Sequence, residues 1–128
     1  MRYLHTMIRV GDLDRSVDFY TRVLGFTQVS RSDYPDGEFT LAFLRAPGDD
    51  ERGPMLELTY NWGVEKYDLG AGYGHVAFQV DSMEAVADRL KDAGVAFSWG
   101  PGKTPDGGTT MAFVDDPDGY RIELLEHS

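Results

Sequence analysis

The sequence predicts an α+β protein made of two βαβββ modules, each consisting of a short strand, a helix and three further strands. Two observations carry this prediction. The segments that begin at His5 and at His75 have the same order of patterns. Each ends in a short motif in which apolar residues flank a glutamate, Glu57 in the first and Glu123 in the second. Each segment also contains one stretch in which apolar residues have the spacing of a helix face, and its other stretches alternate apolar and polar residues as strands do.

With 128 residues, the chain is too short for two independent domains of ordinary size. We therefore expect one domain over residues 1–128, with modules at about 1–62 and 74–128 joined by residues 63–73. The joining stretch contains aromatic residues as well as glycine, unlike a flexible Gly/Ser linker, so we expect it to be packed.

Each predicted helix has an apolar face and recognisable ends. The faces consist of Val17, Tyr20, Val23 and Leu24 in the first half and of Met83, Val86, Leu90 and Ala93 in the second. Gly25 and Gly94 follow the last periodic residues, where a left-handed C-terminal cap favours glycine. Ser82 is the expected N-cap of the second helix, and Asp12 or Asp14 that of the first.

Strand alternation predicts which side chains share a face. Apolar residues on one face should cover the helices, which leaves a polar face on the other side. That polar face should carry His5, Arg9, Glu57, Thr59 and Asn61 in the first half and His75 and Glu123 in the second. Any chemistry is therefore expected there.

Composition excludes several kinds of partner and ligand. A formal net charge of −10 argues against binding of nucleic-acid phosphates, and no apolar run approaches the roughly 20 residues that cross a bilayer. The start of the chain does not resemble a secretory signal, so we expect a cytoplasmic protein. Because there are no cysteines, a metal could be held only by histidines and carboxylates.

Two histidines and two glutamates occupy equivalent places in the repeat. A histidine at the start of a strand is usually structural. Here, however, the chain has only three histidines, and two of them occupy matching positions of the repeat. Each of these two has a glutamate at a matching position between apolar neighbours, where an unpaired charge would be costly. We expect the third, His127, to be a solvent-exposed tail residue. Two nitrogen and two oxygen ligands suit a divalent ion, and positions left open for a substrate would make such a site catalytic.

Six words of the sequence together resemble bacterial glyoxalase I, or lactoylglutathione lyase, over nearly the whole chain. They are LHTMIRVGDL (4–13), SVDFY (16–20), LGF (24–26), LELTYNWG (56–63), YGH (73–75) and FVDDPDGY (113–120). The resemblance implies the vicinal oxygen chelate fold, with curved mixed sheets. It also implies a domain-swapped homodimer whose active sites lie at the subunit interface.

The same resemblance implies roles for individual residues. It makes His5 and Glu57 of one chain and His75 and Glu123 of the other the ligands of one metal ion. The ion should be Ni²⁺ or Co²⁺, with Zn²⁺ as the alternative. Glu123 would be the catalytic base, and Glu57, in the symmetric position, could serve the other enantiomer of the substrate.

Further residues match positions that bind the substrate in this family. Arg9 and Asn61 match residues that grip the glutamyl end of glutathione, and Thr59 lies beside them. Lys103, in a loop that we expect to be mobile, resembles a lysine that approaches the glycyl carboxylate. Some relatives carry an arginine before the Gly-aromatic-Gly-His word, where this chain has Ala71-Gly72.

The implied reaction converts the hemithioacetal of methylglyoxal and glutathione into S-lactoylglutathione, by metal-assisted proton transfer through an enediolate, and so detoxifies methylglyoxal. Three other functions are possible on this fold. An acyl-CoA epimerase also moves a proton next to a carbonyl, and a drug-binding protein of the bleomycin-resistance type needs no metal. An extradiol dioxygenase would need a further histidine, for which only His127 is available.

Overall fold

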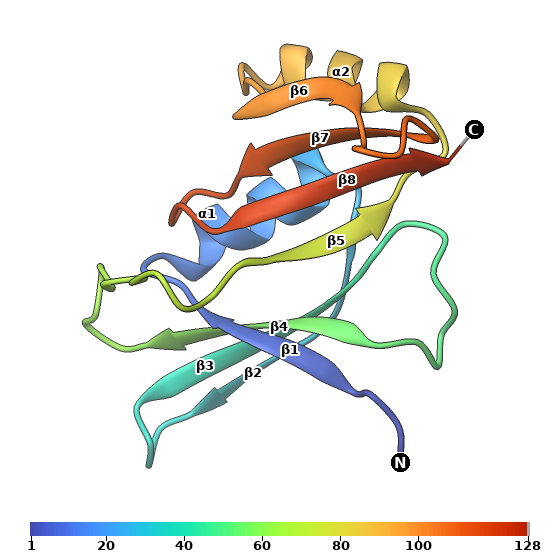
Figure 1. Ribbon diagram of the computed structural model, residues 1–128. Coiled ribbons are helices and arrows are strands. Elements are labelled where there is room, and N and C mark those ends of the chain that lie inside the picture. The colour runs from blue at the N-terminus through green and yellow to red at the C-terminus, as the bar shows by residue number, and fades with distance from the viewer. Residues whose placement is uncertain (128) are drawn as a thin grey trace. The chain divides into compact units, whose positions relative to one another are not determined.

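The computed structural model describes residues 1–127, which form two compact units, one of residues 1–68 and one from residue 69 onward. Each unit contains one four-stranded mixed sheet and helical structure between its first and second strands (Figure 1). The predicted α+β class with two βαβββ modules is therefore confirmed. The division falls inside the stretch that the sequence predicts as the connection.

The first unit has its sheet in the order β1-β4-β3-β2, with β1 parallel to β4 and the other neighbours antiparallel. Its strands are β1 (His5–Arg9), β2 (Thr27–Tyr34), β3 (Phe39–Arg45) and β4 (Met55–Asn61), and its helical elements are α1 (Leu13–Asp18) and η1 (Phe19–Val23). Alternate strand residues, among them Ile8, Leu44 and Leu58, are buried on the side where α1 packs against β4. On β3 their neighbours on the other side are more accessible, whereas Glu57 and Thr59 on that side of β4 are themselves buried.

The sequence led us to expect a continuous α-helix in the first unit, but only its first part is α-helical. Asp12 caps its start by accepting a hydrogen bond from Arg15 N at 3.0 Å, but from Phe19 onward the segment forms a π-turn, in which Leu24 N donates to Phe19 O at 3.2 Å. Phe19, Tyr20 and Val23 of this segment are all buried. The segment ends at Gly25, whose φ is +84°, as predicted.

The second unit repeats the plan with the sheet order β5-β8-β7-β6 and with β5 parallel to β8. Its elements are β5 (His75–Gln79), α2 (Met83–Asp92), β6 (Trp99–Lys103), β7 (Thr109–Asp115) and β8 (Arg121–His127). Ser82 caps α2 by accepting from Ala85 N at 3.1 Å, and Gly94 ends it with a φ of +72°. Leu90 of α2 is buried with Ala112 and Leu124 of the sheet.

The connection between the units differs from the packed segment that we expected. Most residues between 62 and 74 are exposed and belong to no helix or strand. Its first part is attached to the first unit by individual contacts, in which Trp62 Nε1 donates to Thr40 Oγ1 at 2.9 Å and Asn61 Nδ2 donates to Tyr67 Oη at 3.1 Å. Trp62 and Tyr67 thus make single polar contacts instead of filling a core. Among residues 1–127, no helix is long and apolar enough to cross a bilayer.

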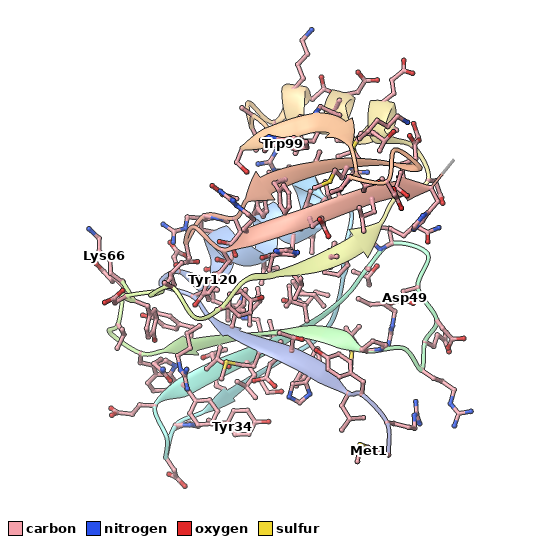
Figure 2. The ribbon with its side chains drawn as sticks, in the orientation of Figure 1. Met1, Tyr34, Asp49, Lys66, Trp99 and Tyr120 are labelled. Atoms are coloured by element: carbon pink, nitrogen blue, oxygen red, sulfur yellow. The ribbon has the colours of Figure 1, made fainter. Side chains whose placement is uncertain are left out.

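Aromatic side chains lie exposed on the outer strands of both sheets (Figure 2). Tyr34, at the end of β2, stacks on Phe39 with ring centroids 5.0 Å apart, and Trp99, at the start of β6, meets the ring of Phe113 edge-on at 6.3 Å. These contacts help to hold each outer strand to its neighbour.

Gly11 is required by close packing in the first unit. A Cβ atom at this position would lie 1.9 Å from the carbonyl oxygen of Glu65. We predict that Gly11→Ala lowers the free energy of unfolding by about 2 kcal/mol, because the backbone around residue 65 must move. Gly72→Ala is the control, since a Cβ at Gly72 would meet nothing within 4 Å. Equal urea-unfolding midpoints for the two variants would contradict this prediction.

Candidate metal centre

A histidine and a glutamate meet on the accessible face of the first sheet. His5 opens β1 and Glu57 lies on β4, and the parallel register brings His5 Nε2 to 3.1 Å from Glu57 Oε1. Glu57 is only 8% exposed, which is unusual for a carboxylate, because burial of an unpaired charge is costly. Its second oxygen, Oε2, accepts a hydrogen bond from Thr59 Oγ1 at 2.9 Å. Both carboxylate oxygens of Glu57 are therefore engaged.

The second unit places an equivalent pair on β5 and β8. His75 Nε2 lies 3.5 Å from Glu123 Oε1, and the strand register is the same as in the first unit. This pair is looser, and the side chain of Glu123 is 17% exposed against 11% for Glu57. The residue two places further along the same face is Leu125, which has no hydroxyl group to donate. The two pairs thus lie at equivalent positions, but only Glu57 has a neighbouring hydroxyl group that donates a hydrogen bond to it.

A phenylalanine orients the imidazole in each pair. The ring of Phe43 meets His5 edge-on, with centroids 5.5 Å apart and planes at 76°, and Phe113 meets His75 at 5.4 Å and 77°. These phenylalanines pair directly with Glu57 and Glu123 across the antiparallel register. Sequence reasoning gave them no role. Their equivalent positions were the signal that could have revealed one.

The donor atoms of each pair are spaced as neighbouring ligands of one metal ion would be. Two ligand atoms about 2.1 Å from an ion and at right angles to each other lie roughly 3 Å apart, close to the separations of the two pairs. The donor types, imidazole nitrogen and carboxylate oxygen, suit divalent ions such as Zn²⁺, Ni²⁺ and Co²⁺. Within residues 1–127, three or more histidine and carboxylate side chains nowhere gather into one group. Each unit therefore contributes a pair.

Polar residues surround the pair of the first unit. Arg9 and Thr59 are direct cross-strand partners on β1 and β4, and Asn61 ends β4 on the same face. Thr59 is only 7% exposed, and its hydroxyl is directed at Glu57. Arg9 and Asn61 are the more accessible of the three.

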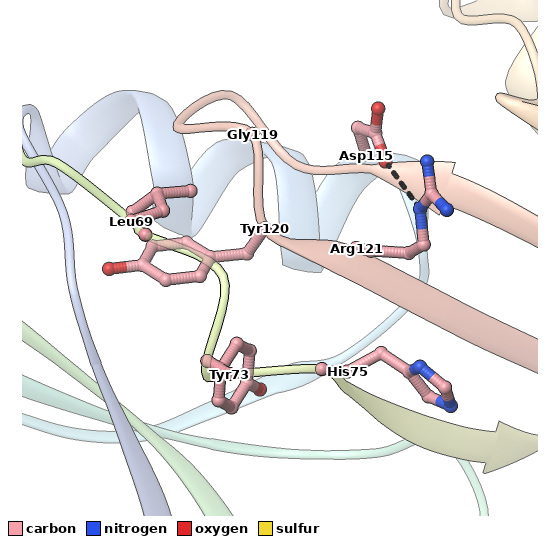
Figure 3. A pocket seen from close by; sticks show the side chains of 9 residues that line it. Leu69, Tyr73, His75, Asp115, Gly119, Tyr120 and Arg121 are labelled. Atoms are coloured by element: carbon pink, nitrogen blue, oxygen red, sulfur yellow. Dashed lines mark ion pairs between the residues drawn. The ribbon is translucent and has the colours of Figure 1, made fainter.

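A cavity of about 360 Å³ opens beside His75 in the second unit, and its walls include Tyr73, Tyr120 and Arg121 (Figure 3). Arg121 lies directly opposite His75 in the strand register. Its Nε is 3.7 Å from Asp115 Oδ1, and its guanidinium lies over the ring of Phe113 at 5.5 Å. Sequence reasoning did not single out Arg121. Its place opposite the histidine, once β5 and β8 are paired, is what brings it to the site.

Two residues lie in strands where the sequence led us to expect a mobile loop and a tail. Lys103 is the last residue of β6, and its Nζ donates to Thr110 Oγ1 at 3.0 Å. In the turn that follows, the side-chain hydrogen bond from Thr104 lowers the pKa of Asp106. His127 ends β8 and lies 3.4 Å from Thr109 Oγ1, although it is exposed as expected. The antiparallel pairing of β7 with β6 reaches Lys103, and its pairing with β8 reaches His127. Both pairings extend further than the turn residues in the sequence led us to expect.

Comparison with known proteins identifies the family. The family described as the Glyoxalase/Bleomycin resistance protein/Dioxygenase superfamily matches residues 2–124. The lactoylglutathione lyase of Neisseria meningitidis serogroup B is 49% identical over 126 residues, which cover 98% of this chain and 91% of the relative. The trypanothione-dependent glyoxalase I of Leishmania major is 44% identical with a TM-score of 0.83, over 98% of this chain and 86% of that one.

A longer relative has the same fold. The glyoxalase I of Zea mays is 41% identical with a TM-score of 0.89, over 98% of this chain but only 47% of the maize chain. The similarity to all three proteins extends over nearly the whole sequence described above. The chain therefore belongs to the glyoxalase superfamily and, within it, to the lactoylglutathione lyases, the glyoxalase I enzymes.

Proposed function

We propose that this protein is a glyoxalase I that isomerises the hemithioacetal of methylglyoxal and glutathione to S-lactoylglutathione, and so removes methylglyoxal. The observation that carries the proposal is the pair of equivalent His–Glu contacts, one in each unit, at 3.1 and 3.5 Å. The identity of nearly half the residues to a lactoylglutathione lyase supports the same reaction. We also propose a cytoplasmic location, since that compartment keeps glutathione reduced.

The four side chains of these pairs, His5, Glu57, His75 and Glu123, are proposed to hold one divalent ion. Their two nitrogens and two carboxylates fit an ion of borderline softness, and Ni²⁺ or Co²⁺ is preferred over Zn²⁺ because the short chain resembles the bacterial branch of the family. When bound, the ion would supply positive charge next to the two adjacent substrate oxygens, where negative charge develops.

Glu123 is proposed to move the proton. Its carboxylate would break the C–H bond of the carbon that carries sulfur and hydroxyl, and would return that proton to the neighbouring carbonyl carbon, which becomes the alcohol carbon of the lactoyl group. The hydroxyl proton would pass to the former carbonyl oxygen, so that the first carbon becomes the thioester carbonyl. The looser contact of Glu123 with His75 and its greater exposure make it the better suited of the two ligand carboxylates to act also as the base. Glu57 would then serve the other enantiomer only if its carboxylate could also reach the substrate.

Binding of the thiol is assigned to cationic and amide side chains. A protein with a net charge of −10 must place cations locally to bind an anionic tripeptide. Arg9 and Asn61 are proposed to hold the glutamyl end, with Thr59 beside them, and Lys103 the glycyl carboxylate. The relative from Leishmania major is described as trypanothione-dependent, so the thiol can differ between members of the family.

We further propose that the active protein is a domain-swapped homodimer. Each unit offers only two donors among the described residues, whereas catalytic metal sites commonly have at least three protein ligands, so the two kinds of pair would have to come together. A chain that covers only 47% of the maize glyoxalase I corresponds to about half of that protein, so two copies would be comparable with it. His5 and Glu57 of one chain would then face His75 and Glu123 of its partner.

Metal addition tests the proposed function directly. We expect protein stripped with a chelator to be inactive on methylglyoxal plus glutathione, and to recover on titration with Ni²⁺ or Co²⁺, followed by thioester absorbance. Higher activity with Zn²⁺ would contradict the choice of metal. Turnover of an acyl-CoA thioester instead would favour the epimerase, and a protein inactive with every ion would favour a drug-binding role.

Replacement of the proposed base should abolish proton transfer without unfolding the protein. We predict that Glu123→Gln lowers kcat at least about 100-fold, since a positioned base contributes two to four orders of magnitude. The amide keeps the size of the side chain but cannot accept the proton. Near-normal kcat in the fully metal-loaded variant would remove Glu123 from this role.

Mixed dimers test whether the sites are shared between chains. If one chain carries His5→Ala and the other His75→Ala, a swapped dimer contains one doubly damaged site and one intact site. We therefore predict that the purified mixed dimer recovers about half of wild-type activity, while each variant alone is inactive. A mixed dimer as inactive as its parents would show that each site takes its donors from one chain.

A further inference from the structure

We propose that Thr59 is a positioning residue, whose hydroxyl fixes the carboxylate of Glu57 as a permanent metal ligand. The equivalent position in the second unit is Leu125, and the missing hydroxyl there leaves Glu123 able to move as the base. This inference rests on the proposed function and explains why two equivalent glutamates would have different roles.

The two positions are equivalent in the sheets. Thr59 lies on β4 between Arg9 of β1 and Leu41 of β3, and Leu125 lies on β8 between Gln79 of β5 and Met111 of β7. Each is two residues beyond its glutamate, so both project from the same face as that glutamate. The scaffold is thus the same at both positions, and the side chain is what differs.

The contact of Thr59 with Glu57 is buried and well formed. The Oγ1 to Oε2 distance is 2.9 Å, and the two residues are 7% and 8% exposed. Hydrogen bonds to ionised acceptors are among the stronger ones in proteins, and the branched Cβ of threonine limits its rotamers. Thr59 is therefore suited to hold a carboxylate in one orientation.

The consequence for Glu57 is that its carboxylate is held at both ends. Oε2 is held by Thr59, and Oε1 lies 3.1 Å from His5 Nε2. A group that carries a proton between two carbons must approach the substrate and change its contacts, which a carboxylate fixed at both oxygens cannot readily do. Glu123 faces a leucine where Glu57 faces a hydroxyl, and its histidine contact is 3.5 Å. The geometry thus assigns the stationary role to Glu57 and the moving role to Glu123.

Metal titration of the purified apoprotein tests the first half of the inference without any activity measurement. We expect Thr59→Val, which is isosteric but lacks the hydroxyl, to weaken Ni²⁺ binding about 10- to 100-fold in calorimetry, the usual range for loss of a group that orients a ligand. Thr59→Ser, which restores the hydroxyl, should bind within about threefold of wild type. Leu125→Val, which puts the same side chain at the equivalent position without removing a hydroxyl, is the matched control and should also leave Ni²⁺ affinity within that range.

Addition of a hydroxyl in the second unit tests the other half. Leu125→Thr should hold Glu123 as Thr59 holds Glu57, so we expect kcat to fall about 10-fold while KM stays near wild type and Ni²⁺ binds at least as tightly as to wild type. An unchanged kcat in Leu125→Thr would overturn the assignment of the moving role. Thermal unfolding of each variant checks that it is folded.

The outcomes separate this inference from the proposed function. Wild-type Ni²⁺ affinity in Thr59→Val, or a loss in Thr59→Ser as large as in Thr59→Val, would overturn the role of the hydroxyl even if the wild-type enzyme is fully active. A wild-type protein inactive on the hemithioacetal, but with the expected difference between Thr59→Val and Thr59→Ser, would overturn the proposed reaction and support the positioning of Glu57.

Discussion

The parallel pairing of the first and last strands in each unit is the constraint on which the site depends. β1 pairs with β4 and β5 with β8, so a histidine at the start of a unit lies beside a glutamate near its end. Parallel neighbours need a crossover, and here the helix and the two intervening strands supply it. The same crossover covers one sheet face with apolar contacts and leaves the other for polar side chains. Fold and site therefore arise from one topological choice.

Duplication of this unit gives two similar surfaces that differ in their polar residues. The positions of Arg9 and Thr59 in the first unit are taken by Gln79 and Leu125 in the second. Conversely, Arg121 lies opposite His75 where Met55 lies opposite His5, so each surface has its cation at a different place and the first alone has a hydroxyl directed at its glutamate. A symmetric scaffold with unequal side chains can bind an asymmetric substrate and give two equivalent glutamates different tasks.

Burial of the Glu57 carboxylate costs free energy of folding, so stability alone does not explain why this residue is there. Apolar side chains of similar size are often as stabilising as buried ionic groups, so a carboxylate that is 8% exposed needs another reason to be there. Its contacts with His5 and Thr59 keep it from being unpaired, and a divalent ion would compensate the charge further. Function explains this arrangement better than folding does.

Local signals in the sequence were enough to predict the repeat, the polar faces and the caps at Ser82, Gly25 and Gly94, and to narrow the first N-cap to Asp12 or Asp14. These features depend on periodicity and on single backbone conformations. Only the tertiary structure decided the π-turn at η1, the exposed connection between the units, the extension of β6 to Lys103, the approach of Arg121 to His75 and the bond from Thr59 to Glu57. These depend on packing and on strand register, which join residues far apart in the chain and leave no mark in any short window of the sequence.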